Sequence, residues 1–476
     1  MTTVSPGEVC LLTRRTPIPS PFVIPVLTPA EMRLVDAEAV ANGADIDTLV
    51  ERAGAAVARA AERMMGGTYG RCVIVIAGKG LNGSDGRVAA RRLAAKGVQV
   101  SIIEASFRPP VLPPCDLVID AAYGTGFRGQ WVGPEVSAPV LAVDLPSGVD
   151  GLTGQAHGSP LQATRTVTFG ALKPGLLMSP GSEYAGRVEV ADLDLPSGNP
   201  RIHLLQAVDV AHWLPQRTID AHKWRAAVWV IAGSPGMLGA AHLAVRAAQR
   251  AGAGMVRLSS PGVGVDPLAP TECVRTHLSS SGWSPEALVD IERFQAAVVG
   301  PGLGRVDAQA DAAREFVAKA PIPLVVDADA LFALAWNSTG PGSVLRARQA
   351  ATVLTPHDGE FALLRGERVG PDRLLDTRRL AADMRCVVLL KGSTTIVADP
   401  TGDVLLVSTG DERLATAGTG DVLSGIIGAL LSQRVPAFEA AAMGAWLHGQ
   451  AGRAGVSRGL VAGDLPDLLT NVFASL

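Results

Sequence analysis

The sequence predicts an α/β protein of two domains, and three observations point to this class. At 476 residues the chain is too long for one comfortable hydrophobic core, so two or three domains are expected. Hydrophobic residues make up 47% of it and aromatic residues only 4%, so its cores must be built from Ala, Val, Leu and Ile. The 53 glycines and 33 prolines together are about 18% of the chain, against roughly 12% in an average protein, which favours many tight turns between strands and helices.

Composition and charge also exclude several classes of protein. The hydrophobic content is too high for a disordered chain, and the glycines follow no three-residue period as they do in collagen. A net charge of −3 without any basic block argues against nucleic-acid binding. Five dispersed cysteines without a C-x-x-C pair indicate neither a zinc site nor a disulfide framework. No apolar run reaches the roughly 18–20 residues of a membrane helix, so we expect a cytoplasmic protein without a membrane partner.

The first domain is expected after a Pro-rich leader, residues 1–25, which lacks the apolar stretch of a signal peptide. Thr28 and Pro29 have the pattern of a helix cap and a first helical residue, and an Ala-rich helix is expected over Ile46–Met65. Short continuous apolar runs are typical of buried parallel strands. Such runs, with a helix between the first two, lie at Cys72–Ala77, Val98–Ile103, Leu117–Asp120 and Val140–Asp144.

A second α/β series follows a stretch without clear periodicity, residues 195–218, and we place the boundary near Gln206. The predicted domains are therefore residues 26–205 and 206–476. In the second domain two helices and a hairpin are expected over Ala240–Ala251, Ala308–Ala320, and Thr395–Asp399 with Val404–Val407. Its other predicted strands are Val228–Ala232, Met255–Leu258, Ala296–Val299, Pro323–Asp327, Thr352–Leu354 and Val387–Leu390.

Polar residues suited to chemistry follow the strands of the first domain. Gly78–Gly86 is a glycine-rich turn between a strand and a helix, where backbone N–H groups and the helix N-terminus can receive a phosphate. Asp120 and Asp144 end the next strands, and Ser147 follows closely. Because the carboxyl ends of parallel strands meet in one crevice, these groups are expected to converge there. Each alone could be a simple turn or a helix cap, but the three clusters together favour a site.

These motifs resemble the NAD(P)HX epimerase domain, a Rossmann-like three-layer α/β/α domain, across about residues 26–205. The resemblance rests on LVERAG at Leu49–Gly54, the turn GKGLNGSDG, DAAYGTG at Asp120–Gly126 and DLPSG at Asp144–Gly148. Members of that family usually have N-N-G-G-D-G in the turn. Here Leu81 replaces the first Asn and Ser84 replaces a Gly.

The resemblance implies residues for each ligand of that family. Asn82, Asp120 and Ser147 match its potassium ligands, and oxygen donors suit such a hard monovalent cation. Asp144 is our candidate for the base that is needed where a stereocentre is inverted. The implied dinucleotide contacts are Leu81, Asn82, Gly83, Ser84, Asp85, Gly124, Thr125, Gly126, Phe127, Arg128, Gly129, Gln130 and Asp144.

The second domain carries a more specific motif, ATAGTGDVLSG at Ala415–Gly425, which places Asp421 at the start of a helix after a Gly-rich loop. Such a loop can hold a phosphoryl group against backbone N–H groups, with the aspartate as a base toward a hydroxyl. The plain alternative is a capped helix after a flexible loop. Four further motifs follow predicted strands, which places them in one expected crevice. They are GPGLG at Gly300–Gly304, DADA at Asp327–Ala330, TPHDGE at Thr355–Glu360 and KGSTT at Lys391–Thr395.

In this order the motifs resemble the ribokinase-like NAD(P)HX dehydratase domain, across about residues 206–476. The resemblance implies contacts to the hydrated dinucleotide from Ala240, Gly302, His357 and Asp421, and contacts to an adenine nucleotide from Lys391, Gly392, Ser393, Thr394, Thr395 and Gly420. The expected nucleotide is ADP with Mg²⁺, with ATP as the alternative that the motifs do not separate, and Glu360 is a candidate outer ligand of the metal. Trp224 stands where the family commonly has Gly, in what we expect to be the entry loop.

Together the two resemblances imply a bifunctional metabolite-repair enzyme, an isomerase and lyase acting on NADHX and NADPHX, the hydrates of NADH and NADPH. The first domain would interconvert the R and S forms, and the second would dehydrate the S form with ADP, releasing AMP and phosphate. We expect a homo-oligomer. Two alternatives stay open: a kinase of the same fold acting on a vitamin precursor, and a non-catalytic N-terminal nucleotide-binding module, which Leu81 would favour.

Overall fold

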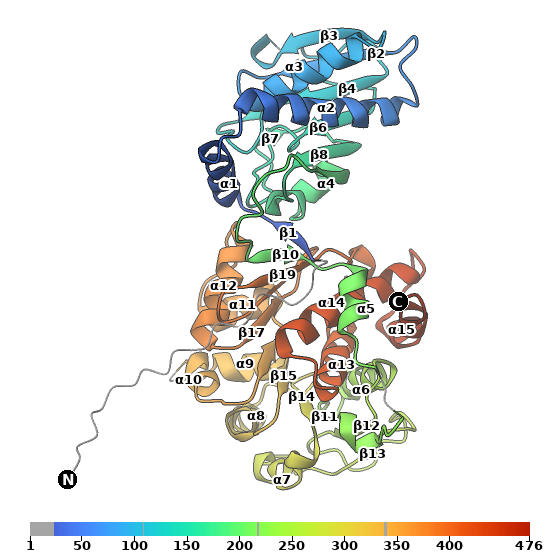
Figure 1. The fold of residues 1–476 in the computed structure, drawn as a ribbon. Coiled ribbons are helices and arrows are strands. Elements are labelled where there is room, and N and C mark those ends of the chain that lie inside the picture. Colours follow the sequence, from blue (N-terminus) through green and yellow to red (C-terminus); the bar gives the residue numbers. More distant parts are fainter. Residues whose placement is uncertain (1–22, 108, 217–218, 338–339) are drawn as a thin grey trace, which may run out of the picture.

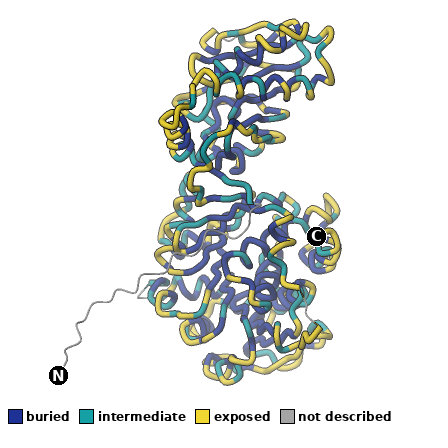
Figure 2. The backbone as a smooth tube through the Cα atoms, in the orientation of Figure 1, coloured by how far each residue is buried: buried dark blue, intermediate teal, exposed yellow. Residues whose placement is uncertain are grey.

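The computed structural model describes residues 23–107, 109–216, 219–337 and 340–476, and most of the predicted leader, residues 1–22, lies outside this part. Two α/β bodies follow one another along the chain, and each is built on its own sheet (Figure 1). Buried residues concentrate in the strands and on the inner faces of the helices of each body (Figure 2). Each body therefore has buried apolar clusters of its own, in agreement with the two α/β domains predicted from the sequence.

The N-terminal body is built on a six-stranded sheet of order β3-β2-β4-β6-β8-β9, in which all neighbours are parallel. From β2 the chain adds β3 on one side and then crosses to add β4 on the other. Ligands bind such sheets at this switch point, at the carboxyl ends of the strands. The strands are β2 Cys72–Ala77, β3 Gln99–Glu104, β4 Leu117–Ala121, β6 Val140–Val143, β8 Arg165–Phe169 and β9 Arg187–Ala191.

Two helices rich in small residues, α2 (Ile46–Met65) and α3 (Leu81–Ala94), cover one face of this sheet. They approach closely, because a Cβ atom on Gly54 would lie 2.4 Å from the Cβ of Val88. The other face is covered by loops and short strands around the buried Trp131. The remaining elements of this body are α1 Pro29–Ala41, η1 Ala105–Phe107, β5 Trp131–Val132, β7 Gly158–Ser159, η2 Pro174–Leu176 and α4 Gly181–Ala185.

The C-terminal body is built on an eleven-stranded sheet of order β1-β10-β19-β18-β17-β16-β15-β14-β11-β12-β13. It is parallel from β17 to β13, and β18 is antiparallel to both of its neighbours. The strands are β1 Ile24–Val26, β10 Ile202–Leu204, β11 Ala227–Ile231, β12 Met255–Ser259, β13 Val274–Arg275, β14 Ala296–Val299, β15 Leu324–Val326, β16 Thr352–Leu354, β17 Val387–Leu390, β18 Thr395–Ala398 and β19 Val404–Val407.

Helices cover both faces of the large sheet, and each face has its own apolar cluster. One face carries α7 Ser284–Val289, α8 Asp307–Lys319, α9 Asp329–Ala335, α10 Pro341–Arg346, α11 Asp358–Arg365 and α12 Arg373–Met384. The other carries α5 Ala207–Trp213, α6 Leu238–Arg250, α13 Thr419–Ser432, α14 Ala437–Ala454 and α15 Leu465–Ala474. Short 3₁₀ turns complete the body: η3 Lys223–Ala226, η4 Ile291–Arg293, η5 Glu412–Leu414 and η6 Ala462–Asp464.

The two bodies are joined by strand pairing and by side-chain contacts. Strand β1 pairs antiparallel with β10, which pairs with β19, so a segment that precedes the first body is part of the second sheet. The backbone N–H of Leu27 donates to the carbonyl oxygen of Leu172 at 2.9 Å. The hydroxyl of Thr394 donates to the carbonyl oxygen of Leu177 at 2.5 Å. The chain changes sheets between β9 and β10, shortly before the expected boundary near Gln206.

Most elements expected from the sequence are confirmed. The helix Ile46–Met65 and the strands at 72–77, 296–299 and 352–354 have the predicted bounds. The cap of α1 is also confirmed, since Thr28 Oγ1 accepts from the N–H of Glu31 at 3.2 Å, and Glu31 Oε2 accepts from the N–H of Thr28 at 2.8 Å. Strands β8 and β9 were not predicted, because polar and charged residues interrupt their apolar runs.

Two expectations are wrong. The turn predicted over Gly78–Gly86 is shorter, since α3 already begins at Leu81. Gly83 lies inside that helix against the preceding turn, where a Cβ would come within 1.9 Å of the carbonyl oxygen of Gly78. Trp224 does not line an entry loop at the carboxyl ends of the strands. It lies at the amino end of β11, with Phe294 at 5.8 Å between ring centroids.

Within the described ranges, no helix combines the length and apolar character needed to cross a membrane.

The contact between α6 and α13 leads to a stability prediction. A Cβ on Gly425 would lie 2.2 Å from the carbonyl oxygen of Ala244, which belongs to helix backbone and cannot move aside. We expect Gly425→Ala to lower the free energy of unfolding by ~1–3 kcal/mol, measured by urea unfolding. Gly264→Ala is the control, because a Cβ there meets nothing within 4 Å. Equal stability of the two variants would contradict this packing.

Candidate active sites

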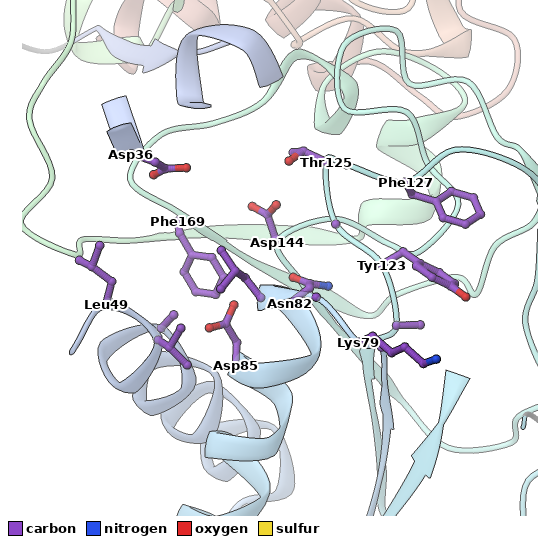
Figure 3. Close-up of a pocket in the computed structure, with 18 of the residues that line it drawn as sticks. Asp36, Leu49, Lys79, Asn82, Asp85, Tyr123, Thr125, Phe127, Asp144 and Phe169 are labelled. Carbon is purple, nitrogen blue, oxygen red and sulfur yellow. The ribbon is translucent and has the colours of Figure 1, made fainter. Parts of the chain in front are cut away.

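A cavity of about 1190 Å³ opens at the carboxyl ends of β2, β4 and β6, with α1 and α2 forming its apolar wall (Figure 3). It is formed where the sheet topology predicts a ligand site. Of the residues expected to contact a dinucleotide, nine line it: Leu81, Asn82, Asp85, Gly124, Thr125, Gly126, Phe127, Arg128 and Asp144. Gly83, Ser84, Gly129 and Gln130 are not among its lining residues.

Asp144 is held in the cavity by a lysine that the sequence analysis missed. The backbone of Asp144 has a φ of 65°, which is unusual for a residue other than glycine. Its N–H donates to the carbonyl oxygen of Val167 at 2.7 Å. Lys173 Nζ lies 2.8 Å from Asp144 Oδ1, and Lys173 is only 1% exposed. The ammonium also donates to Thr168 Oγ1 at 2.8 Å and to the carbonyl oxygen of Phe169 at 2.9 Å. This arrangement fixes the side chain of Asp144 beside the buried ammonium group of Lys173.

Asp85 lines the same cavity as Asp144, but no described lysine pairs with it there and its pKa is raised (Figure 3). Burial and the nearby negative charge of Asp144 raise the pKa of Asp85 to about 8. The pKa of Asp36, across the cavity, is also raised by burial, although Lys173 counteracts this. One cavity therefore holds two carboxyl groups in different surroundings, one with a raised pKa and one paired with a lysine, an arrangement suited to acid–base catalysis.

Two of the three expected potassium ligands, Asp120 and Ser147, are in direct contact. Ser147 Oγ donates to Asp120 Oδ1 at 2.6 Å, and the N–H of Ser147 donates to Asp120 Oδ2 at 2.9 Å. Asp120 is fully buried, no described residue forms an ion pair with it, and burial raises its pKa. The Nδ2 atom of Asn82 is buried and lacks a hydrogen-bond partner. Asp120 and Ser147 thus bring side-chain oxygen atoms together at one buried point, which suits a monovalent cation.

The second candidate site lies at the carboxyl ends of β15 and β17. Lys391 Nζ donates to Asp327 Oδ1 at 2.8 Å, and Ser424 Oγ of α13 donates to Asp327 Oδ2 at 2.6 Å. Asp327 is 1% exposed, so these bonds satisfy a carboxylate that would otherwise be buried alone. Through Asp327, these two bonds connect Ser424 in the first half of α13 to the loop that begins at Lys391.

Asp421 lies beside this pair. Burial and the negative charge of Asp327 raise its pKa to about 7, while Lys391 acts in the opposite direction. The glycines before it leave room around these groups, since a Cβ on Gly420 would lie 3.3 Å from Lys391 Nζ. Asp421 is thus a carboxyl group that can both accept and release a proton near neutral pH.

The remaining expected dinucleotide contacts of this domain flank that centre. A Cβ on Gly302 would lie 3.1 Å from the Cβ of Ala240, so these two residues are neighbours. His357 caps α11, where its Nδ1 accepts from the N–H of Gly359 at 2.9 Å, and its own N–H donates to Glu360 Oε2 at 3.0 Å. Burial raises the pKa of Glu360, with Lys391 acting in the opposite direction. A divalent cation brought in by a nucleotide would stabilise this carboxylate.

The loop expected to bind a nucleotide is only partly open. Gly392 and Ser393 are exposed and Thr395 begins β18, but Thr394 is buried with its hydroxyl bonded to Leu177. In the described part of the chain no cluster of three or more His, Cys, Asp or Glu side chains could hold a metal ion. A magnesium ion here would depend on phosphate oxygens of the nucleotide.

Comparison with known proteins connects both sites to families. A family model described as NAD(P)H-hydrate dehydratase matches residues 228–473. A model described as YjeF-related protein N-terminus matches residues 46–112 and 103–175. A ribokinase-like superfamily protein from Enterococcus faecalis superposes with a TM-score of 0.51 at 22% identity, covering 58% of this chain and 96% of that one, which supports the fold alone.

Curated relatives match over most of the chain. The bifunctional NAD(P)H-hydrate repair enzyme Nnr of Moorella thermoacetica is 37% identical over 494 residues, covering 90% of this chain and 92% of that protein. The protein of the same name from Mycobacterium leprae is 39% identical over 419 residues, covering 81% and 84%. That from Escherichia coli is 33% identical over 447 residues, covering 84% of each.

The raised pKa of Asp85 leads to a prediction about stability. The native state holds this proton more tightly than the unfolded state, whose aspartate titrates near 3.8. The stability it contributes is therefore complete below about pH 4 and is lost as the pH rises through about 8. Asp85→Asn cannot ionise, so its stability relative to the unaltered protein should increase by at least ~1 kcal/mol between pH 5 and 9.

Urea unfolding at the two pH values measures this difference. Asp311→Asn serves as the control, because the Asp311 side chain is 70% exposed and its stability difference should not change with pH. An unchanged difference for Asp85→Asn as well would show that the Asp85 carboxyl is not held protonated.

Proposed function

The chain belongs to the family of bifunctional NAD(P)H-hydrate repair enzymes, and we propose that its two α/β bodies each perform one of the two reactions. The N-terminal body interconverts the R and S hydrates of NADH and NADPH. The C-terminal body dehydrates the S form with ADP, releasing AMP and phosphate, and ATP is the alternative phosphoryl donor. The observation that carries this assignment is the presence, on two separate sheets, of a lysine–aspartate pair beside a second carboxyl group with a raised pKa.

Asp144 and Asp85 suit the epimerisation. The carbon that bears the hydroxyl in the hydrate also bears the ring nitrogen, so its configuration inverts when the ring opens to an aldehyde and closes on the other face. Asp144 takes the hydroxyl proton while the carbon–nitrogen bond breaks toward nitrogen, and Asp85, which carries a proton, supplies it to that nitrogen. The reverse transfers close the ring, and both groups return to their starting states.

Asp421 and Lys391 suit the dehydration. Asp421 takes the proton from the hydroxyl of the hydrate as that oxygen attacks the terminal phosphorus of ADP, and AMP leaves. The Gly-rich loop before α13 offers backbone N–H groups to the transferred phosphoryl group, and Lys391 adds positive charge beside it. The phosphate then leaves from carbon and takes up the proton that the neighbouring carbon loses, because phosphate is a much better leaving group than hydroxide. This elimination restores the dihydropyridine ring.

Two ions complete the proposal. A potassium ion at Asn82, Asp120 and Ser147 would compensate the buried carboxylate of Asp120 and orient the groups around it. Mg²⁺ would neutralise nucleotide phosphates, with Glu360 as an outer partner. The cytoplasmic location and the homo-oligomeric state stay predictions from the sequence.

The alternatives raised by the sequence have no separate support. The matches cover both bodies, and the relatives are named for hydrate repair rather than for a vitamin-precursor kinase. Leu81, the one residue in favour of a non-catalytic N-terminal module, is 64% exposed at the cavity and does not displace Asn82 or Asp144 from its lining.

Substitution of one aspartate in each body tests the division of labour. A mixture of R and S hydrates is supplied with ADP, Mg²⁺ and K⁺, and the return of the dihydronicotinamide absorbance is followed. We expect complete conversion by the unaltered protein. Asp144→Asn should stop after the S form is consumed, apart from slow spontaneous epimerisation, because its base is lost. Asp421→Asn should abolish dehydration while leaving epimerisation measurable. Equal loss of both activities in either variant would refute separate sites.

The pKa of Asp421 predicts how dehydration depends on pH. A base acts only when deprotonated, so kcat/KM for the S hydrate should fall about tenfold per pH unit below about 7 and level off above it. The profile is measured on epimerically pure S hydrate with saturating ADP. A rate that stays constant from pH 5.5 to 8.5 would show that Asp421 is not the base.

A further inference from the structure

An arginine at the C-terminal site belongs to none of the motifs discussed above. Arg305 directly follows Gly304 in the loop between β14 and α8, which also contains Gly302. Gly302 is next to Ala240, and both are expected dinucleotide contacts. Arg305 therefore extends from the loop on which the substrate is expected to lie.

The side chain of Arg305 is held in place by two contacts. Its Nε donates to Asp329 Oδ1 at 2.7 Å, and its Cζ lies 4.9 Å from the centre of the Phe332 ring. The other oxygen of Asp329 accepts from the N–H of Gly304 at 2.9 Å, which ties the loop to the same carboxylate. The guanidinium group is thus fixed relative to the loop by side chains of α9.

The free edge of this guanidinium group is available to a ligand. The Arg305 side chain is 57% exposed, and no described residue accepts a hydrogen bond from its two Nη atoms. A planar fork held by its Nε and resting on an aromatic ring matches the oxygens of a phosphate group, and little side-chain entropy is lost on binding.

The position of Arg305 distinguishes between the two phosphate-bearing ligands of the site. Arg305 follows β14 and its partner Asp329 follows β15, so the arginine lies on the side of the site formed by these two strands. The loop expected to bind ADP follows β17, three strands away in the sheet, or roughly 14 Å at the usual strand spacing. Because Arg305 shares its loop with Gly302, an expected dinucleotide contact, the phosphate expected at Arg305 is one of the dinucleotide.

We propose that Arg305 is a substrate-binding residue of the dehydratase site, whose guanidinium group binds a phosphate of the hydrated dinucleotide. This phosphate is either the pyrophosphate, which NADHX and NADPHX share, or the 2′-phosphate, which only NADPHX has. The inference rests on the proposed dehydratase activity of the C-terminal body. Asp329 is a positioning residue, since it holds both the guanidinium group and the loop.

The test compares Arg305→Gln with the unaltered full chain, using the S forms of NADHX and NADPHX separately with saturating ADP. Loss of a charge-assisted contact should raise KM roughly tenfold with kcat changed little, because Asp421, Lys391 and the nucleotide loop stay in place. A rise for both substrates indicates the pyrophosphate, and a rise for NADPHX alone indicates the 2′-phosphate. Arg305→Lys keeps the charge but loses the planar fork, so its KM should lie between that of the unaltered protein and that of Arg305→Gln.

Arg293→Gln is the matched control. Arg293 lies before β14 at the opposite end of the same strand, has a side chain 53% exposed, and also lies over an aromatic ring, Trp224, at 4.4 Å. Its KM values should equal those of the unaltered protein. Unchanged KM values for Arg305→Gln with both substrates, or a loss of kcat without a rise in KM, would overturn the inference.

A binding measurement separates failure of this inference from failure of the proposed function. Calorimetric titration with NADPH and NADH, which carry the same phosphates as the hydrates, needs no turnover. It is carried out on Asp144→Asn and on Asp144→Asn/Arg305→Gln, so that binding at the N-terminal site is altered equally in both proteins. Weaker NADPH binding in the second protein supports the role of Arg305 even if no dehydration is observed. Equal binding in the two proteins would overturn it.

Discussion

The structure depends on a buried lysine–aspartate pair at the carboxyl edge of each sheet. Lys173 with Asp144 and Lys391 with Asp327 are each 2.8 Å apart, and in each pair one partner is about 1% exposed. A charge buried at that depth is tolerated only when it is paired and hydrogen-bonded, so each pair fixes the strand ends and loops around it. Each pair also places a fixed negative charge beside another carboxyl group. The raised pKa values of Asp85 and Asp421 follow from that proximity together with burial.

The small side chains of the protein make this arrangement possible. Parallel strands bring residues distant in sequence to one edge, and the glycines between strand and helix let helices begin close to that edge. Gly83 packs against the backbone at Gly78, and Gly425 packs against the backbone of α6. Both contacts exclude a Cβ atom. Part of the high glycine content is therefore needed because these helices begin or cross close to other backbone at the candidate sites.

The two sites are separate, yet one short segment of chain connects them. Lys173 pairs with Asp144 at the N-terminal cavity, and four residues later the carbonyl of Leu177 accepts from Thr394 in the loop expected to bind the nucleotide. Leu177 and Met178 are buried in the same apolar cluster as residues of the large sheet. Strand β1 adds a second connection, since it precedes the first body in sequence but pairs in the second sheet. The bodies are therefore joined without sharing a reacting centre.

Most of the fold and part of each site could be predicted from the sequence, for physical reasons that differ between residues. Buried parallel strands are continuous apolar runs, so the sequence predicts β2, β14 and β16. It also predicts the aspartates and the loops that follow such strands. Lys173 was missed because the strand before it, β8, alternates threonine with other residues and because its partner is 29 positions away. Arg305 and Ser424 acquire their roles only through contacts made by folding. The raised pKa of Asp85 arises mainly from burial, which a sequence motif does not reveal.

The most direct test of two independent centres on one chain is complementation between two defective proteins. Asp144→Asn and Asp421→Asn are mixed in one tube with R and S hydrates, ADP, Mg²⁺ and K⁺. Since hydrates released by one protein diffuse to the other, the account predicts complete return of NADPH at a rate well above spontaneous epimerisation. A mixture that stops where Asp144→Asn alone stops would contradict it, because it would show that the Asp421→Asn protein has no epimerase activity of its own.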